Sequence, residues 1–149
     1  MNETSDLVLQ NYSLIQQIFI LGDDLDRRLL AAFNLSVSRF NLLKHLADRG
    51  SLTATNLCVL LLCDKANVTR LLDGLEREGL VKRTPDQYDG RRTSVTLTPS
   101  GETRLQEANS AYAASVIDRF SGLAFQDQST LNETLNQIKN VFQQRLQTM

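Results

Sequence analysis

Basic, amide and hydroxyl side chains recur between residues 65 and 92, and these side chains suit contacts with DNA. Arginine pairs with guanine O6 and N7, asparagine pairs with adenine N6 and N7, and threonine offers a hydroxyl or a methyl group to bases. Lysine and arginine also neutralise phosphates. The candidates are Lys65, Asn67, Thr69, Arg70 and Arg77 in the first half of the segment, and Asp89, Arg91 and Arg92 in the second half. The sequence therefore predicts double-stranded DNA as a partner, provided that these residues share one surface.

A capped amphipathic helix is expected to carry the first five candidates. Asp64 suits the N-cap, and Gly79 followed by Leu80 fits a Schellman ending. The apolar residues repeat at i, i+3, i+4 and i+7, which buries one face; they are Val68, Leu71, Leu72 and Leu75. The opposite face then presents Ala66, Arg70, Asp73 and Arg77 to solvent. The alternative interpretation is a merely solvated face on which Asp73 and Arg77 form an i, i+4 ion pair.

A long-tipped β-hairpin is expected to carry the other three candidates. Residues 80–84 and 93–98 are rich in β-branched side chains, and the connecting loop contains Pro85 and the turn-forming pair Asp89-Gly90. Two arginines at the tip of a projecting ribbon can enter a minor groove. Asp89 is expected to hold the Arg91 side chain by a bidentate pair, which makes Arg91 the stronger minor-groove candidate. Arg92 is either a phosphate contact or an ordinary surface residue.

The remaining pattern predicts helices on both sides of this segment. Their expected positions are Leu7 to about Phe33, Val37 to Asp48 after a Ser36 cap, a short helix capped by Thr53 and ending near Leu62, a helix from Thr98 or Ser100 to about Phe120, and Asp127 to Gln147. Two helices and a hairpin in this order indicate a winged helix-turn-helix. The terminal helices carry more apolar surface than one small core can bury, so we expect a helical homodimer interface.

Composition bounds the class of protein. The chain has 149 residues, 42% of them hydrophobic and 22% charged, as in a globular helix-rich domain. Its net charge is −1, which disfavours nonspecific coating of nucleic acid. A single histidine, His45, and two cysteines offer neither a catalytic constellation nor a zinc site, so we expect no enzyme, no metal and no cofactor. The acidic amino terminus and the short apolar runs predict a cytoplasmic protein.

The segment "NVTRLLDGLEREGLVKRTPDQYDGRRTSVTLTPSGE", residues 67–102, resembles the signature of the MarR family of bacterial transcription regulators. That pattern is approximately T-V-T-R-L-V-D-x-L-E-x-x-G-L-V-x-R, then D-x-x-D-x-R, then L-T-x-x-G. The resemblance implies a mainly α fold with a small β-hairpin wing: a DNA-binding lobe over residues 36–99 and a helical dimerisation region over 1–35 and 100–149. It further implies a homodimer on a palindromic operator, a repressor, and release by a small-molecule effector, commonly phenolic or anionic.

Two departures from the family pattern and three rival functions accompany this interpretation. Asp64 and Ala66 replace frequent serines at the helix start, and Gly90 replaces a frequent arginine. The candidate polar members of an effector pocket are Arg39, His45 and Tyr112. The alternatives are a winged-helix module for protein contacts, an enzyme, and a redox-responsive regulator that uses Cys58 or Cys63. Cys63 precedes a helix start and Lys65, which would lower a thiol pKa, whereas Asp64 opposes that effect.

Overall fold

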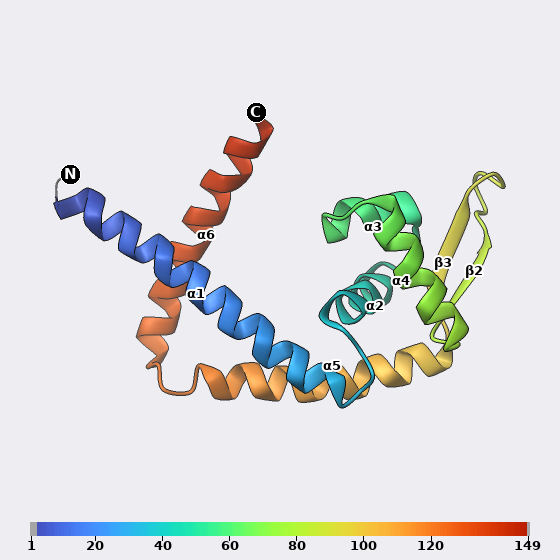
Figure 1. Ribbon diagram of the computed structural model, residues 1–149, viewed down its shortest axis with the longest axis horizontal. Helices are drawn as coiled ribbons and strands as arrows, with labels where there is room; N and C mark the ends of the chain where they lie inside the picture. Colours follow the sequence, from blue (N-terminus) through green and yellow to red (C-terminus); the bar gives the residue numbers. More distant parts are fainter. Residues whose placement is uncertain (1–2, 149) are drawn as a thin grey trace. The chain divides into compact units, whose positions relative to one another are not determined.

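The computed structural model describes residues 3–148 and shows a mainly helical chain with one small antiparallel sheet (Figure 1). In chain order the elements are α1 (Glu3–Ala31), α2 (Val37–Arg49), β1 (Ser51–Thr53), α3 (Ala54–Leu61), α4 (Lys65–Arg77), β2 (Val81–Pro85), β3 (Thr93–Leu97), α5 (Pro99–Arg119) and α6 (Phe125–Gln147). The chain divides into a unit that ends at Tyr112 and a unit that begins at Ala113. The expected fold class is confirmed, and element ends agree within two residues except at the start of α1.

The sheet has three strands in the order β1-β3-β2, all antiparallel. The predicted hairpin is β2 and β3, in which Arg83 lies opposite Val95. Strand β1 was not predicted: Leu52 pairs with Val95 on the other side of β3. Three residues are too short to show strand alternation, and their partner is far along the chain, so local pattern carries no sign of this strand. We call β2, β3 and their connecting loop the wing, and α2 through β3 the winged lobe.

Helices α3 and α4 form the helix-turn-helix, and their ends carry the expected caps. The Thr53 hydroxyl accepts the backbone N–H of Asn56, and the side-chain oxygen of Asn56 accepts the backbone N–H of Thr53. These two bonds form a capping box. At the end of α4, Gly79 adopts φ 71°. The N–H of Gly79 donates to Glu76 and that of Leu80 to Leu75, both at 2.9 Å. This is the predicted Schellman motif.

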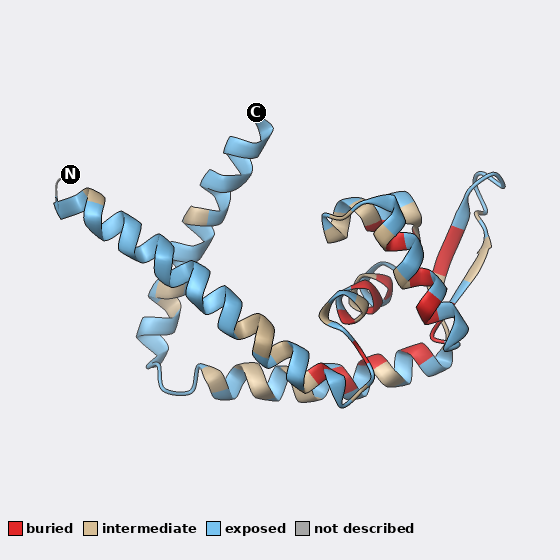
Figure 2. Ribbon diagram, viewed as in Figure 1, coloured by how far each residue is buried: buried red, intermediate tan, exposed pale blue. Residues whose placement is uncertain are grey.

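The hydrophobic core lies inside the winged lobe and where α1 and α5 reach it (Figure 2). Helix α2 contributes four fully buried side chains, Phe40, Leu42, Leu43 and Leu46. Helix α4 contributes Val68, Leu72 and Leu75, and the wing adds Val81 and Val95. Within residues 3–148 no buried side-chain nitrogen or oxygen lacks a hydrogen-bond partner. The lobe therefore supplies most of one apolar core, which Leu30 of α1 and Leu105 and Ala108 of α5 complete.

Helices α1 and α6 show the opposite pattern, because their large apolar side chains are exposed (Figure 2). Only Leu30 of α1 is buried, and no described residue of α6 is. Exposed examples on α1 are Ile18 at 62% and Phe19 at 74%, and on α6 Leu146 at 74%. Among the described residues no helix is sufficiently long and apolar to cross a membrane. Exposed apolar surface on this scale is typical of a surface that packs against another molecule.

Helix α5 starts in close contact with the end of the helix-turn-helix. Thr98 donates its N–H to the Leu80 carbonyl at 3.1 Å and its hydroxyl to the Gly79 carbonyl at 2.5 Å. The same hydroxyl accepts the N–H of Gly101 at 3.1 Å, so Thr98, and not Ser100, caps α5. A methyl group added at Gly101 would overlap the Leu80 carbonyl oxygen. Thr98 and Gly101 thus both allow the start of α5 to lie close to the backbone of Gly79 and Leu80.

Replacing Gly101 by alanine tests this approach. We expect Gly101→Ala to lower the free energy of unfolding by about 2 kcal/mol or more, because backbone must move to admit the methyl group. Urea unfolding followed by circular dichroism measures the change. Gly90→Ala is the control, since nothing lies within 4 Å of a methyl group there, and its effect should stay within about 0.5 kcal/mol. Equal midpoints for Gly101→Ala and wild type would contradict the contact.

Candidate nucleic-acid interface

The outward face of α4 carries the residues that the helical spacing predicted. Ala66, Arg70, Asp73 and Arg77 are all exposed, while Val68, Leu72 and Leu75 are buried on the other side. Lys65 and Thr69 are exposed in the first two turns. The start of α4 and the tip of the wing lie at the same end of the lobe (Figure 1). The structure therefore places the start of α4 and the tip of the wing at one end of the lobe, whereas Arg77 lies in the last turn of α4.

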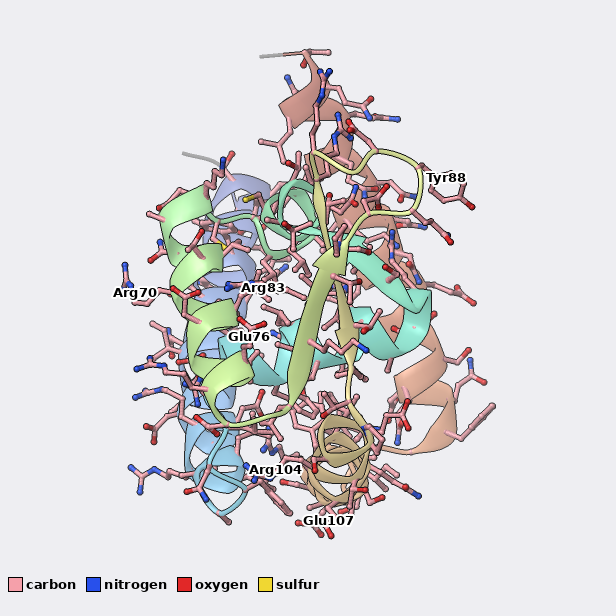
Figure 3. The ribbon with its side chains drawn as sticks, turned by 90° about the vertical axis from the view of Figure 1, so that its right-hand side faces the viewer. Arg70, Glu76, Arg83, Tyr88, Arg104 and Glu107 are labelled. Carbon is pink, nitrogen blue, oxygen red and sulfur yellow. The ribbon has the colours of Figure 1, made fainter. Side chains whose placement is uncertain are left out.

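A chain of hydrogen bonds orients Arg70. The Asp64 carboxylate caps α4 by accepting the N–H of Asn67 at 2.8 Å and the Asn67 side-chain amide at 2.9 Å. The Asn67 oxygen then accepts Nη2 of Arg70 at 3.0 Å. Asp64 thus replaces the family's serine with a carboxylate that starts this chain. Arg70 projects from α4 away from the sheet (Figure 3), with its other guanidinium donors available.

Thr69 and Arg77 both bond to the backbone of their own helix. The Thr69 hydroxyl donates to the Lys65 carbonyl at 2.8 Å, which leaves its lone pairs and its methyl group for a partner. Nε of Arg77 donates to the Asp73 carbonyl at 3.2 Å. The Asp73 carboxylate does not pair with Arg77, so the alternative of an i, i+4 ion pair is wrong. Its actual partner lies on the wing.

Arg83 of β2 connects the wing to α4, a contact that no local pattern in the sequence predicts. Its guanidinium lies 2.7 Å from Oδ1 of Asp73 and 3.0 Å from Oε2 of Glu76 (Figure 3). Spacing rules cover pairs on one helix, whereas here a helix end and a turn separate the partners. The two carboxylates are substantially exposed, so the pairs add at most about 1 kcal/mol of stability. Their consequence is geometric: one guanidinium of the wing contacts two carboxylates of α4, which links the wing to that helix.

The wing loop, residues 86–92, is shaped by its two aspartates. One carboxylate oxygen of Asp86 accepts the N–H groups of Tyr88 at 2.9 Å and of Asp89 at 3.0 Å. Backbone bonds of 2.8 Å join Asp86 N–H to the Arg92 carbonyl, and Arg92 N–H to the Asp89 carbonyl. These bonds define the course of the loop backbone between Asp86 and Arg92.

The expected pair between Asp89 and the side chain of Arg91 is wrong. Oδ1 of Asp89 accepts the backbone N–H of Arg91 at 3.1 Å, and Oδ2 lies 3.6 Å from Nε of Arg92. The local turn takes up one carboxylate oxygen, and the residue three positions on is the one whose side chain reaches the other. The guanidinium of Arg91 forms no ion pair with another described residue. Arg92 is thus the restrained arginine, and Arg91 is the one available to a partner.

A second ionic cluster closes the far end of α4. Glu78, which follows the helix, lies 2.6 Å from Nη1 of Arg39 and 4.0 Å from Nη1 of Arg104. Arg104 also donates to the Phe33 carbonyl at 3.2 Å. Arg39 lies across Gly74 of α4, where an added methyl group would overlap its guanidinium. Arg39 is therefore a structural residue between α2 and α4, and not a member of the crevice described next.

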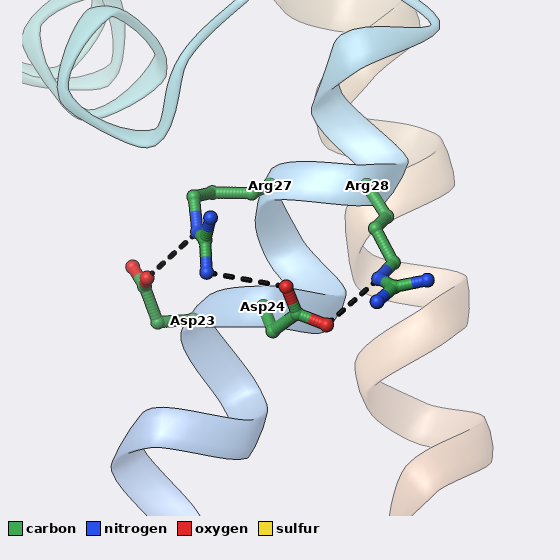
Figure 4. A network of polar contacts seen from close by, with 4 residues as sticks. All are labelled: Asp23, Asp24, Arg27 and Arg28. Carbon is green, nitrogen blue, oxygen red and sulfur yellow. Dashed lines mark hydrogen bonds and ion pairs between the residues drawn. The ribbon is translucent and has the colours of Figure 1, made fainter.

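A crevice of about 350 Å³ lies between α1, α2 and α5. Of the three candidate pocket residues, Tyr112 lines this crevice, whereas His45 and Arg39 do not. The Tyr112 ring lies 5.0 Å from that of Phe40, and its hydroxyl is 3.4 Å from the Asp26 carboxylate. Asp23 also lines the crevice and pairs with Arg27 at 3.0 Å (Figure 4). The described lining thus contains two carboxylates and no basic side chain.

Cys63 lacks the lowered pKa of a reactive thiol. Both cysteines are half-buried, and neither forms a disulfide. Burial raises the pKa of Cys63 above the ordinary 9.0, and the neighbouring Cys58 and Asp64 act in the same direction. A raised pKa leaves little thiolate near neutral pH, and thiolate is the reactive form. Among residues 3–148 no group of His, Cys, Asp or Glu side chains could hold a metal ion.

Known proteins share both the sequence and the fold of this chain. The MarR family profile matches residues 33–92. The multiple antibiotic resistance protein MarR of Salmonella typhimurium is 32% identical over 112 residues, which cover 73% of this chain and 78% of that protein. The transcriptional regulator BldR from Sulfolobus solfataricus has a TM-score of 0.80 at 28% identity, over 94% of this chain and 99% of that one. A mutant MarR from E. coli, crystallised with operator DNA, shares the fold with a TM-score of 0.78 at 22% identity, over 93% and 99% of the chains. The chain belongs to the MarR family of DNA-binding, winged helix-turn-helix transcription regulators, which are not enzymes.

Proposed function

We propose that this protein is a homodimeric repressor that binds a palindromic operator and is released from it by a small-molecule effector. One observation carries the proposal: the start of α4, whose outward face carries an oriented Arg70, and a pre-shaped wing loop lie at the same end of the lobe. A helix for the major groove beside a ribbon for the minor groove is the docking geometry of winged helices.

Each candidate residue receives a role under this proposal. Asn67, Thr69 and Arg70 contact bases in the major groove, and Lys65 binds a phosphate at the helix start. Arg77 and Arg92 contact phosphates, and Arg91 enters the minor groove. Asp89 positions the arginines through its bonds to both. Residues 36–99 then form the DNA-binding lobe, and residues 1–35 with 100–149 form the dimerisation region.

Selection of duplexes from a random pool tests this function, followed by affinity measurements on the selected site across salt concentrations. We expect a palindrome. Arg70→Ala should cost about 1–3 kcal/mol of binding free energy by removing a bidentate base contact. Arg91→Ala should reduce the salt slope by about 1 through loss of a charge near the minor groove. Arg28→Ala is the matched control, because it removes the same charge from an exposed position on α1.

Two outcomes would contradict the docking. Unchanged affinity of both wing and helix variants on the selected duplex would mean that DNA binds elsewhere. Weak binding with no preferred sequence would favour the alternative of a winged-helix module for protein contacts.

The exposed apolar faces support the homodimer. Residues 7–21 of α1 contain no charged side chain, and Ile18, Phe19 and Ile20 are each more than 60% exposed. In the other unit, α6 exposes Val141, Phe142 and Leu146. Apolar surface on this scale is normally covered in a soluble protein. A second copy of the chain can cover this surface, because in a symmetric homodimer the same apolar faces of the two copies pack against each other.

Sedimentation velocity tests the dimer. Wild type should sediment as a dimer at micromolar concentration, and Ile18→Glu should raise the dimer dissociation constant at least about tenfold by burying an unpaired charge. Val59→Glu is the control, because Val59 is 69% exposed on α3 within the winged lobe. A wild-type monomer that binds the palindrome as tightly as a dimer would refute the proposal.

The crevice beside Tyr112 is the proposed effector site, and its lining indicates the chemical class. Aromatic rings of Phe19, Phe40 and Tyr112 suit a planar apolar ligand. The lining has two carboxylates, Asp26 and the Arg27-paired Asp23, and no basic side chain, so it disfavours an anion. We therefore propose a cationic aromatic effector in place of the anionic one that the family resemblance implies. Carboxylates and aromatic faces both attract organic cations.

Release of labelled operator, followed by fluorescence anisotropy, tests the effector class. An aromatic amine that is positively charged at pH 7 should release DNA at lower concentration than the aromatic carboxylate of the same size. Asp23→Asn should weaken the response to the amine by about threefold or more. Asp118→Asn, outside the crevice, is the control. A stronger response to the carboxylate would overturn the assignment.

A further inference from the structure

Tyr88 is a large aromatic side chain with no apparent structural use. It lies in the wing loop and is 89% exposed. It points outward from the loop, on the side that faces away from α4 (Figure 3). Tyrosine combines a broad apolar ring with a polar hydroxyl and loses little conformational entropy on binding, so it is common at binding surfaces. Its position therefore suggests a contact with a partner.

The loop holds Tyr88 in this position through its backbone. The N–H of Tyr88 donates to the Asp86 carboxylate at 2.9 Å, and two backbone bonds between residues 86, 89 and 92 close the turn. The phenol ring takes part in none of these bonds. A side chain that is displayed by a pre-formed loop binds without the cost of ordering the loop.

The charges and the surface around Tyr88 favour DNA over protein. Asp86 accepts two N–H groups and Asp89 faces Arg92, so the carboxylates of the loop are engaged while Arg91 is available. The hollow beside Tyr88, about 520 Å³, is lined mainly by hydroxyl and amide side chains such as Ser51, Thr53 and Asn56. It offers no large aliphatic pocket of the kind that anchors a protein partner.

We propose that Tyr88 is a further DNA-contacting residue, whose ring packs on a deoxyribose at the edge of the minor groove that Arg91 enters. Its hydroxyl then donates to the adjacent phosphate. The inference rests on the proposed function, because the same loop carries Arg91 and lies at the same end of the lobe as the start of α4. The proposed Tyr88 contact is uncharged and lies outside the stretch of DNA that α4, the proposed recognition helix, contacts.

A single tryptophan provides the direct test, because the chain contains none. The tryptophan fluorescence of the Tyr88→Trp variant should change on titration with the selected operator. This change should follow the same binding curve as the fluorescence anisotropy of labelled operator. Phe125→Trp is the control: it is 86% exposed at the start of α6, and DNA should not alter its emission.

Tyr88→Ala gives an independent test through affinity. We expect a dissociation constant roughly fivefold higher, with the salt slope unchanged because no charge is lost. Tyr88→Phe should recover most of the affinity if the ring supplies the main contact. The urea midpoint of Tyr88→Ala should equal that of wild type, since the exposed ring packs on nothing in the fold.

The outcomes separate this inference from the proposed function. An unchanged Tyr88→Trp emission at saturating operator, with Arg91→Ala still weakening binding, would overturn only the role of Tyr88. Failure of wild type to bind any selected duplex would overturn the proposed function itself. A fall in salt slope for Tyr88→Ala equal to that for Arg91→Ala would show that the loop had been disrupted, and would also overturn the proposed contact.

Discussion

Burial of the apolar stripe on α4 determines the rotation of that helix, and the proposed interface depends on this rotation. Val68, Leu72 and Leu75 are almost fully buried against α2 and the sheet. A rotation of one residue would expose these side chains and would turn Arg70 toward the core, which costs several kcal/mol in lost apolar burial and charge desolvation. The caps at Asp64 and Gly79 then fix where the helix begins and ends.

Ion pairs join α4 to the elements around it, in addition to the contacts that apolar packing makes. Packing determines which face of α4 is outward, and it also joins α4 to the wing through Val81 and Val95. Arg83 contacts two carboxylates on α4, and Glu78 receives Arg39 and Arg104 at the other end. None of these pairs is fully buried, so each contributes little to stability. These pairs engage Arg39, Arg83 and Arg104 within the fold. Lys65 and Arg91, by contrast, form no ion pair with a described residue, and both lie where DNA is proposed to bind.

The chain separates its two kinds of surface. The winged lobe buries its own apolar residues and presents polar ones, whereas α1 and α6 present apolar faces. In the proposed dimer, those faces are covered by a second copy, and the spacing between two lobes sets the spacing of operator half-sites. The crevice beside Tyr112 lies between the lobe and α1. A ligand bound in this crevice would contact both α1 and the winged lobe, and would therefore act on the contact between them.

The sequence by itself determined most of the fold, because its signals are local. Helical periodicity, Ser36, Thr53 and Asp64 as caps, and the Schellman glycine all act within a few residues, and the structure confirms each. Tertiary structure alone decided the rest. Strand β1, the contacts of Arg83 and Glu78, and the approach of Leu80 to Gly101 join residues with no fixed spacing. Inside the wing loop, backbone hydrogen bonds set the directions of the side chains. The Asp89 carboxylate therefore lies beside the side chain of Arg92, and the side chain of Arg91 is left available.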